Sequence, residues 1–492
     1  MIKLFPLLLF MPLLQAQRLT PAAGDAPSIH GAKVYGCRPN HPFIYRIPCT
    51  GQRPMRFTAR NLPPELALDK TSGIITGTSP AKRGDYVVTF QAKNSHGTAE
   101  RKFKIVVGDT LALTPPMGWN HWYTFYDRIS DKLFRSAADA MIASGMADYG
   151  YQFVNMDDCW MTKPDSVPAR DAGGAILPNQ NFPDLKALTD YIHAKGLKAG
   201  IYTSPGPTTC GKFTGAYEHE EADARRFAQW GFDFLKYDWC SYSRIAPHPT
   251  LEDRQKPYAQ MSAILKSLDR DIVFNLCQYG AGDVWKWGAE VGGNAWRTTG
   301  DLGLAKDTRL PGFYHIGLSN AAHWEYAGPG HWNDPDYILI GFIGNARSMS
   351  EPAKRTPLTP DEQYSYMSMW SLMAAPLFYS GDMGQLDDFT LNVLCNAEVI
   401  DVDQDPLGKQ AKIVRQNEDE LILAKPMEDG SLAVGLFNLS ESRRTISAAW
   451  QDLGLKGRRR VRDVWRYTDL GRAERQFSKE IAPHGVMFVR II

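Results

Sequence analysis

The chain has 492 residues, which is long for one domain and predicts about two or three. Its 55 basic and 54 acidic residues give a formal net charge of +1, so charge does not direct it toward nucleic acid or an anionic membrane. Aromatic residues make up 11% of the chain and include 13 Trp. Aromatic rings stack on sugars but also fill cores, so this content is weak evidence for carbohydrate binding.

The N-terminus has the pattern of an export signal. Lys3 precedes an apolar stretch from Leu4 to Leu14, and the small residue Ala16 follows. This stretch is too short to span a bilayer, and no later segment is apolar enough to do so. A buried first helix fits the pattern less well. We therefore expect a signal peptide over residues 1–16 and an exported protein, periplasmic or secreted, without membrane insertion.

Residues 25–109 read as short strands separated by turns. Apolar and polar residues alternate over 43–47, 86–90 and 103–107, with Gly, Pro, Asn and Asp between these runs. Several short strands at this spacing predict a β-sandwich. Residues 66–86 also resemble a bacterial immunoglobulin-like module. Such modules position or extend an enzyme, so we expect no chemistry in this segment.

Residues 111–405 change to alternating strands and helices. The strand candidates end near Trp119, Asp158, Thr203, Asp238, Gln278, Asp301, Asp336 and Ser380. Helical patterns at 130–144, 184–194 and 220–230 lie between several of them. This alternation predicts a (β/α)8 TIM barrel rather than an open doubly wound sheet. No GxGxxG follows the first strand, which argues against dinucleotide binding.

Residues 410–492 return to the alternation of strands. The runs 421–424, 432–438 and 485–491 predict a closing antiparallel β domain, a second sandwich. The basic run from Lys456 to Arg462 is better explained as a solvated strand face than as a binding patch. Because no low-complexity linker precedes this segment, we expect the barrel and the C-terminal domain to pack as one unit.

The chain holds an odd number of cysteines, seven, so at least one is unpaired. Cys37 and Cys49 could staple the N-terminal module. Cys210 and Cys240 lie near the ends of neighbouring predicted strands. The others, Cys159, Cys277 and Cys395, have no obvious partner, and without CxxC spacing we expect no structural zinc site.

Carboxylates follow several of the predicted barrel strands. They are Asp157, Asp158, Asp238, Asp301, Asp334, Asp336 and Asp382. The apolar runs before Asp157 and Asp238 read as buried strands, and carboxylates are rarely buried unless paired. These residues therefore belong where strands leave the core, which is where a barrel enzyme keeps its chemistry.

The carboxylates indicate acid–base chemistry on sugars. No His or Cys cluster accompanies the carboxylates, so we expect no metal and no cofactor. No GxSxG elbow is present to supply the serine nucleophile of a Ser-His-Asp triad. Several Asp with aromatic neighbours suit a glycosidase, in which one carboxylate attacks the anomeric carbon and another protonates the leaving oxygen.

The barrel resembles glycoside hydrolase family 27, the clan of α-galactosidases and α-N-acetylgalactosaminidases. The matching runs stand in the family's order at 116–120, 157–160, 200–202, 236–240, 297–301, 328–336, 373–377 and 396–410. The resemblance implies a retaining exo-α-galactosidase that forms a covalent glycosyl-enzyme intermediate on a carbohydrate substrate. It implies that Asp238 is the nucleophile and Asp301 the general acid/base.

The same resemblance implies the sugar contacts. Asp157 and Asp158 match the residues that hold the C4 and C6 hydroxyls, and Trp119 matches an aromatic wall of the pocket. The further implied contacts are Tyr202, Cys210, Lys236, Gln278, Arg297 (at the C2 hydroxyl) and Asp336. The resemblance also implies a Cys210–Cys240 disulfide against the pocket.

Two physical requirements accompany the implied catalytic roles. A nucleophile must stay ionised, and Lys236, two residues before Asp238 on the same face of a strand, favours its charged form. The acid must hold its proton near the working pH. The negative charge of ionised Asp238 would favour the protonated form of Asp301 once a substrate excludes water.

The sequence departs from the family at cysteines. Residues 121–128 offer no Cys to pair with Cys159, and the usual partner of Cys277 is missing too. We therefore expect reduced thiols at both positions.

The loop at 277–283 leaves the specificity for the C2 substituent open. Galactosidases of the family tend to place Glu and a bulky Leu there, and the acetylated-sugar enzymes use Ser and Ala, but this chain has Gln278 and Ala281. Trp285 or Trp287 could fill the gap. An α-N-acetylgalactosaminidase is therefore the first alternative. A β-L-arabinopyranosidase ranks lower, because a bulkier acid at 157 or 158 would favour it.

A non-catalytic carbohydrate-binding protein on a decayed barrel is the alternative from another class. Its sequence sign would be the loss of Asp238 or Asp301, and both are present. The oligomeric state is not predicted.

Overall fold

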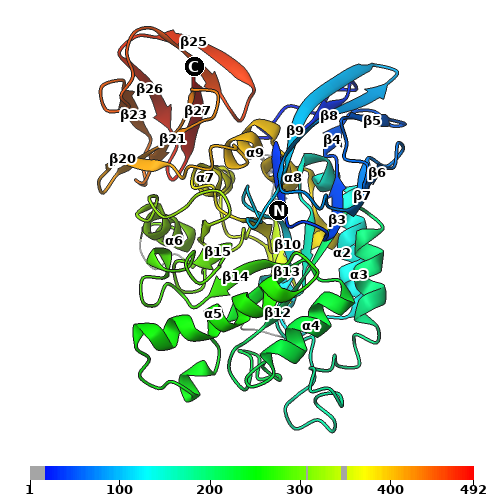
Figure 1. Cartoon of the computed structure of the whole chain (residues 1–492). Helices are drawn as coiled ribbons and strands as arrows, with labels where there is room; N and C mark the ends of the chain where they lie inside the picture. The colour runs from blue at the N-terminus through cyan, green and yellow to red at the C-terminus, as the bar shows by residue number, and fades with distance from the viewer. Residues whose placement is uncertain (1–16, 306–308, 345–351) are drawn as a thin grey trace, which may run out of the picture.

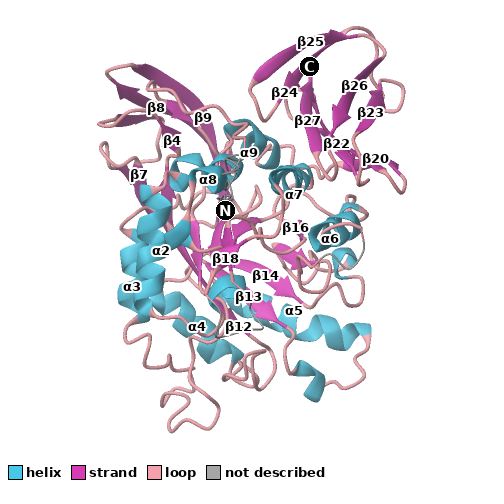
Figure 2. Cartoon of the chain, turned by 180° about the vertical axis from the view of Figure 1, so that it is seen from behind, coloured by secondary structure: helices cyan, strands magenta, loops and turns pink. Residues whose placement is uncertain are grey.

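The structure is a computed structural model that describes residues 17–305, 309–344 and 352–492. The expected signal peptide over residues 1–16 lies outside the described residues. Figure 1 shows a central barrel with a β module from each end of the chain on one side of it. Seen from behind in Figure 2, α8 (Asp388–Leu394) and α9 (Ala397–Asp403) lie between the two β modules.

Eight parallel strands form the barrel, in the order β16-β15-β14-β13-β12-β11-β10-β19. They are β10 (Met117–Asn120), β11 (Phe153–Asn155), β12 (Lys198–Thr203), β13 (Phe234–Asp238), β14 (Val273–Cys277), β15 (Ala295–Arg297), β16 (Trp332–Asp334) and β19 (Leu377–Tyr379). The sheet closes because Ile338, beyond β16, bridges to Tyr379 in parallel. The amide of Ile338 donates to the carbonyl of Phe378 at 2.7 Å. The predicted barrel is confirmed.

Helices follow most of the barrel strands. They are α1 (Trp122–Phe125), α2 (Asp131–Ala143), α3 (Leu185–His193), α4 (Glu220–Trp230), α5 (Leu251–Ser267), α6 (Gly312–Ala321) and α7 (Pro360–Leu372). The three predicted helical patterns correspond to α2, α3 and α4. Between β14 and β15 the described chain forms only a short 3₁₀ turn, η3 (Val284–Lys286), in place of an α-helix.

One strand end differs from the expectation. The sequence places a strand end near Asp301, but β15 stops at Arg297. The guanidinium of Arg297 donates to the carbonyl of Gly300 at 2.7 Å, so the chain after β15 turns back over the Arg297 side chain. Asp301 therefore lies on a loop.

The N-terminal module has two main sheets. They have the strand orders β2-β9-β8-β5 and β3-β7-β6. Their strands are β2 (Val34–Cys37), β3 (Pro42–Arg46), β5 (Arg56–Arg60), β6 (Leu66–Leu68), β7 (Ile74–Thr78), β8 (Gly84–Asn94) and β9 (Gly97–Val107), with a short pair β1 (Ser28–Ile29) and β4 (Cys49–Thr50) beside them. Cys37 and Cys49 are both buried as free thiols, so the disulfide considered for this module is absent.

The N-terminal module covers the amino ends of the barrel strands. Arg38 donates from Nε to Oδ1 of Asp271 at 2.8 Å, and His41 Nδ1 lies 2.8 Å from the same oxygen. Asp271 precedes β14. Tyr35 contacts Lys198, the first residue of β12, through its hydroxyl and its ring. The module therefore lies opposite the end where the strands deliver their carboxylates.

The C-terminal domain is an antiparallel sandwich. One sheet has the order β20-β21-β22-β27-β24-β25, and β23 pairs with β26. The strands are β20 (Lys412–Gln416), β21 (Glu420–Pro426), β22 (Leu432–Asn438), β23 (Arg444–Ala449), β24 (Arg459–Asp463), β25 (Thr468–Ala473), β26 (Gln476–Ile481) and β27 (Val486–Ile491). One apolar core runs from the barrel through α7 into residues such as Phe437 and Phe488, so the two parts pack as one unit.

No helix in the described ranges is both long and apolar enough to cross a membrane.

Candidate active site

The carboxyl ends of the barrel strands gather a set of buried charged side chains. Asp157 follows β11, and its Oδ2 accepts hydrogen bonds from Asn120 Nδ2, Lys236 Nζ and the Tyr337 hydroxyl, each at 2.9 Å. Burial by itself would raise the pKa of Asp157. The charges of Lys236 and His121 outweigh it, and the pKa lies below its ordinary value. Asp157 is therefore a fixed anion in a closed hydrogen-bond network.

Asp158 has a different environment from its neighbour. Its carboxylate accepts from the amide of Cys159 at 2.7 Å and from the amide of Gly211 at 2.6 Å. Burial is the largest influence and raises the pKa of Asp158 to about 7. Near neutral pH this carboxyl can therefore either accept or donate a hydrogen bond.

Asp238 is the last residue of β13, and its partners are two tyrosines. The Tyr279 hydroxyl donates to Oδ1 at 2.7 Å, and the Tyr202 hydroxyl to Oδ2 at 3.3 Å. Burial raises the pKa of Asp238 to about 6, although the charge of Lys236 acts in the opposite direction. Lys236 thus favours the ionised form as expected, but its direct partner is Asp157. The effect of burial on the pKa of Asp238 is larger than this effect of Lys236.

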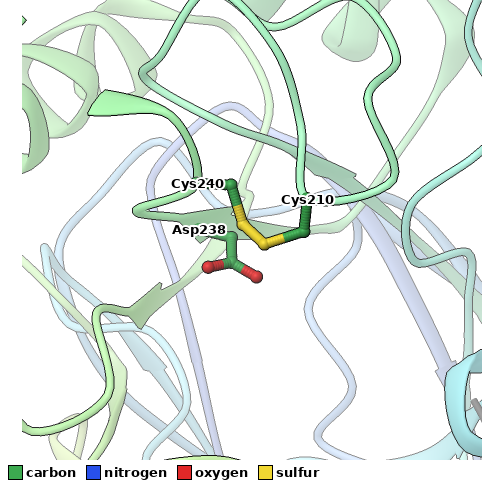
Figure 3. A group of neighbouring side chains, drawn as sticks. All are labelled: Cys210, Asp238 and Cys240. Carbon is green, nitrogen blue, oxygen red and sulfur yellow. A yellow bond between two sulfur atoms is a disulfide. The ribbon is translucent and has the colours of Figure 1, made fainter. Parts of the chain in front are cut away.

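The disulfide between Cys210 and Cys240 is present, as predicted. Figure 3 shows it lying against the carboxylate of Asp238. Both sulfurs lie 3.5 Å from the Tyr279 hydroxyl. Within the described parts of the chain, Cys210, Cys240 and Asp238 form the one group of three potential metal ligands, but their two sulfurs are bonded to each other.

Arg297 links two of the predicted carboxylates, Asp301 and Asp336. Its Nη2 lies 3.0 Å from Oδ2 of Asp336 and 3.4 Å from Oδ1 of Asp301. Oδ2 of Asp336 also accepts from the Tyr123 hydroxyl at 2.6 Å and from the amide of Leu302 at 2.9 Å. Burial raises the pKa of Asp336, while Arg297 lowers it. These contacts tie the loop that carries Asp301 to the end of β16.

Asp301 differs from the other carboxylates because its side chain is 49% exposed, whereas that of Asp336 is 1% exposed. Its charge nevertheless raises the pKa of Asp238, so the two groups are within electrostatic reach of each other. A half-exposed carboxyl beside a buried one allows one group to exchange protons with water while the other stays shielded.

The structure buries Trp119 and Gln278. Trp119 is fully buried, and its indole donates to the carbonyl of Gly381 at 2.9 Å. Its role as an aromatic wall stays a prediction. Gln278 accepts from the amide of Gly280 at 2.7 Å, while its own Nε2 is buried without a hydrogen-bond partner among the described residues.

Two carboxylates at predicted strand ends have structural partners. Asp334 accepts from Nδ2 of Asn275 and from the amide of Asp336, each at 2.8 Å. Asp382 caps the 3₁₀ turn η4 (Met383–Gln385) by accepting from the amide of Gly384. Neither residue was predicted to contact the sugar.

Sequence reasoning missed the phenols that hold the carboxylates. Tyr123, Tyr279 and Tyr337 each donate to one of them, and they come from three different segments of the chain. Tyr279 stands in the loop already singled out for specificity, which was the one available signal. The free thiols expected at Cys159 and Cys277 are confirmed, and Cys395, which had no obvious partner, is free as well.

Buried carboxylates at the carboxyl ends of parallel barrel strands are typical of the class of hydrolases that act on glycosides through acidic side chains. The sequence profile of the family described as alpha galactosidase A matches residues 114–405. A profile for the alpha galactosidase C-terminal beta sandwich domain matches residues 418–491, and an Ig-domain profile matches residues 38–108. The chain therefore belongs to the alpha galactosidase A family of glycoside hydrolases.

Individual relatives agree with this membership. The chain is 40% identical to an α-galactosidase of Cyamopsis tetragonoloba over 76% of this chain and 85% of that protein. The crystal structure of a protein from Bacteroides fragilis that is described as an α-galactosidase/melibiase superposes with a TM-score of 0.87 at 36% identity. The match covers 95% of this chain and 98% of that chain. A β-L-arabinopyranosidase of Geobacillus stearothermophilus superposes with a TM-score of 0.69 at 25% identity, covering 77% and 96%.

Proposed function

We propose that the protein is a retaining exo-α-galactosidase that removes terminal α-linked galactose from oligosaccharides or polysaccharides. The observation that carries the proposal is that two neighbouring carboxyl groups have unequal environments. Asp238 is buried and accepts hydrogen bonds from two phenols. Asp301 is half exposed, and its charge acts on Asp238. Two carboxyl groups in different environments are what a two-step displacement needs.

In the first step Asp238 acts as the nucleophile. A carboxylate oxygen of Asp238 forms a bond to the anomeric carbon while the bond from that carbon to the leaving oxygen breaks, and Asp301 gives its proton to that oxygen. A bound sugar would exclude water from Asp301 and strengthen its repulsion by ionised Asp238, which keeps the proton in place. In the second step Asp301 takes a proton from water while the water oxygen bonds to the anomeric carbon. The bond from that carbon to Asp238 breaks, and the carboxylate of Asp238 is restored.

Asp157 and Asp158 are proposed to bind the C4 and C6 hydroxyls, and Lys236 is proposed as a further contact of the same sugar. Asp157 is a fixed acceptor bound to Lys236, whereas Asp158 can accept or donate because burial raises its pKa to about 7. Charge-assisted hydrogen bonds of this kind are stronger than neutral ones. Trp119, Tyr202, Cys210 and Asp336 remain proposed contacts of the same sugar.

Arg297 and Gln278 are proposed to meet the substituent at C2. Gln278 Nε2 is a buried donor without a partner in the described part of the chain, and such groups are uncommon unless a ligand or water satisfies them. A hydroxyl oxygen at C2 is a suitable acceptor. The small side chain of Ala281 keeps α-N-acetylgalactosaminidase as the second candidate, since it leaves space that a bulkier residue would fill.

A side-by-side assay separates these activities. We expect p-nitrophenyl α-galactoside to be turned over with a kcat/KM at least tenfold above that of its 2-acetamido analogue and of p-nitrophenyl β-L-arabinopyranoside, because one substituent changes binding by about 1–3 kcal/mol. The variant Asp238→Ala should abolish turnover by losing the nucleophile. If the wild-type protein binds galactose but turns over none of the three substrates, it is a binding protein and the proposal fails.

We also propose export by the signal peptide of residues 1–16. The bounds 25–109, 111–405 and 410–492 are our proposal for the three domains. Expression of the full chain in a bacterial host tests export. The expected result is enzyme in the periplasm or the medium with a mature N-terminus after Ala16, and full-length enzyme retained inside the cell contradicts it.

A further inference from the structure

Tyr279 is fixed in place from several sides. It follows β14 in the left-handed region with φ 64°, and Gly280 follows with φ 81°. A Cβ on Gly280 would meet the carbonyl oxygen of Thr298 at 2.3 Å, so the loop lies against the neighbouring segment. The amide of Gly280 donates to Gln278. The backbone of this loop therefore determines the direction of the Tyr279 side chain.

The two oxygens of Asp238 are held unequally. Oδ1 accepts from the Tyr279 hydroxyl at 2.7 Å, the usual length of a hydrogen bond between two oxygens. Oδ2 accepts from the Tyr202 hydroxyl at 3.3 Å, which is long. Lys236 does not bridge this asymmetry, because its ammonium is bonded to Asp157.

We propose that Tyr279 is a positioning residue for the nucleophile, which fixes Oδ1 of Asp238 and leaves Oδ2 as the oxygen that attacks the sugar. The inference rests on the proposed retaining mechanism and adds to it a residue and the choice of oxygen. Oδ2 keeps the more available lone pair because its hydrogen bond is the weaker one.

The bond to Tyr279 changes strength during the cycle. When Oδ2 bonds to the anomeric carbon and the leaving group departs with the proton of Asp301, Oδ1 becomes the carbonyl oxygen of a neutral ester. When water attacks the same carbon, the bond to Oδ2 breaks and its electron pair restores the charged carboxylate. A phenol binds a carboxylate more strongly than an ester carbonyl. Tyr279 therefore favours the second step, in which Asp238 leaves.

Tyr279 is a neutral donor throughout. Burial, followed by the charge of Asp238, raises the pKa of Tyr279 far above its ordinary value. Its hydrogen bond in turn lowers the pKa of Asp238, in opposition to burial. Removing the hydroxyl should consequently make Asp238 harder to ionise.

The first test is the pH profile of Tyr279→Phe, which keeps the ring and removes only the hydroxyl. For the wild-type protein we expect kcat/KM on p-nitrophenyl α-galactoside to fall as the pH drops through about 6, where Asp238 takes up its proton. In Tyr279→Phe this acid limb should move to higher pH by about one pH unit, a tenfold change in proton affinity. The exposed Tyr326→Phe serves as the matched control and should leave the profile unchanged.

The second test follows the intermediate. With 2,4-dinitrophenyl α-galactoside, whose leaving group needs little help, the variant should slow the hydrolysis of the glycosyl-enzyme about tenfold more than its formation. A pre-steady-state burst of dinitrophenol should then appear or grow. A merely structural role for Tyr279 would lower both rates together and leave the acid limb in place, and that result overturns the inference.

A second substitution protects the test against poor folding of the first. Site-specific replacement of Tyr279 by 3-fluorotyrosine keeps the hydroxyl and makes it a stronger donor, so the acid limb should move to lower pH. An acid limb that does not move, or that moves upward, contradicts the inference. Failure of the wild-type protein to turn over any α-galactoside would instead sink the proposed function, so the two failures are distinguishable.

Discussion

At the scale of single residues, the site contains a carboxyl group, Asp238, whose ionised form is destabilised by burial. Asp238 is buried, and its pKa of about 6 lies above the ordinary value of 3.8. The folded protein therefore holds the proton more tightly than the unfolded chain does. Ionising Asp238 at neutral pH therefore costs stability, and the proposed nucleophilic role requires the ionised form.

Replacing the proposed nucleophile Asp238 by its neutral analogue should therefore stabilise the protein. We expect Asp238→Asn to raise the free energy of unfolding at pH 7 by about 1–3 kcal/mol, because the ionised carboxylate is no longer buried. The gain should shrink as the pH falls through about 6 and vanish near pH 4, where wild-type Asp238 is protonated in the folded state. Thermal unfolding of both proteins across pH 4–7 measures this, and an equal difference at every pH would contradict it.

The neighbouring anion should behave in the opposite way. Asp157 is 1% exposed on its side chain and bonded to Lys236, so Asp157→Asn leaves a buried ammonium without its counter-charge. We expect a loss of about 3–5 kcal/mol in stability and of most of kcat/KM. Urea unfolding and the galactoside assay measure the two effects. The double variant Asp157→Asn/Lys236→Met should recover stability but no activity, and no recovery would argue against the ion pair as the cause.

At the scale of elements, loops at the strand ends determine where the carboxylates point. The loop after β12 passes Gly211 against Asp158, to which it donates its amide hydrogen. A Cβ at Gly211 would lie 2.9 Å from Cys159 Sγ and 3.0 Å from Oδ2 of Asp158. This loop also carries Cys210, so the disulfide and the glycine contact act on one segment.

We expect Gly211→Ala to displace this loop. Overpacking of this kind costs about 1–3 kcal/mol, and the lost hydrogen bond should lower kcat/KM about tenfold. The matched control is Gly108→Ala, since no atom of the described residues lies within 4 Å of a Cβ there. Kinetics and thermal unfolding of the two variants measure the difference. Equal behaviour of both would show that Gly211 tolerates a side chain.

At the scale of the whole molecule, the N-terminal module acts as a base for the barrel. Arg38 donates to Asp271 and also to the backbone carbonyls of Lys266 and Arg270, so one side chain binds the end of α5 and the start of β14. The module lies at the amino ends of the strands, away from the site. Its effect on catalysis should therefore act through stability.

Removing that anchor tests the role of the module. Arg38→Ala leaves the half-buried carboxylate of Asp271 without its main cation, and we expect a loss of about 3 kcal/mol in stability. The kcat/KM of the folded fraction at 25 °C should change less than twofold. Unfolding by urea and the galactoside assay check both statements, and a large change in KM would place the module within reach of the substrate.

Much of the fold was predictable because it depends on local pattern. The buried runs before Asp157 and Asp238 and the helical pattern at 220–230 correspond to β11, β13 and α4. Local pattern failed where a tertiary contact ends an element, as when Arg297 turns the chain back before Asp301. It also left the pairing of Cys37 and Cys49 open, since pairing depends on the distance and direction of side chains in space, and both are free thiols.

The sequence by itself determined the class of this protein, because the order of strands, helices and carboxylates is written along the chain. It also named the implied nucleophile Asp238 and the implied acid Asp301. Only the tertiary structure decided the partner of each carboxylate: Lys236 binds Asp157, and Tyr279 binds Asp238. The physical reason is that a buried carboxylate is stabilised by the hydrogen-bond donors and positive charges nearest to it in space, and these come from segments far apart in the sequence.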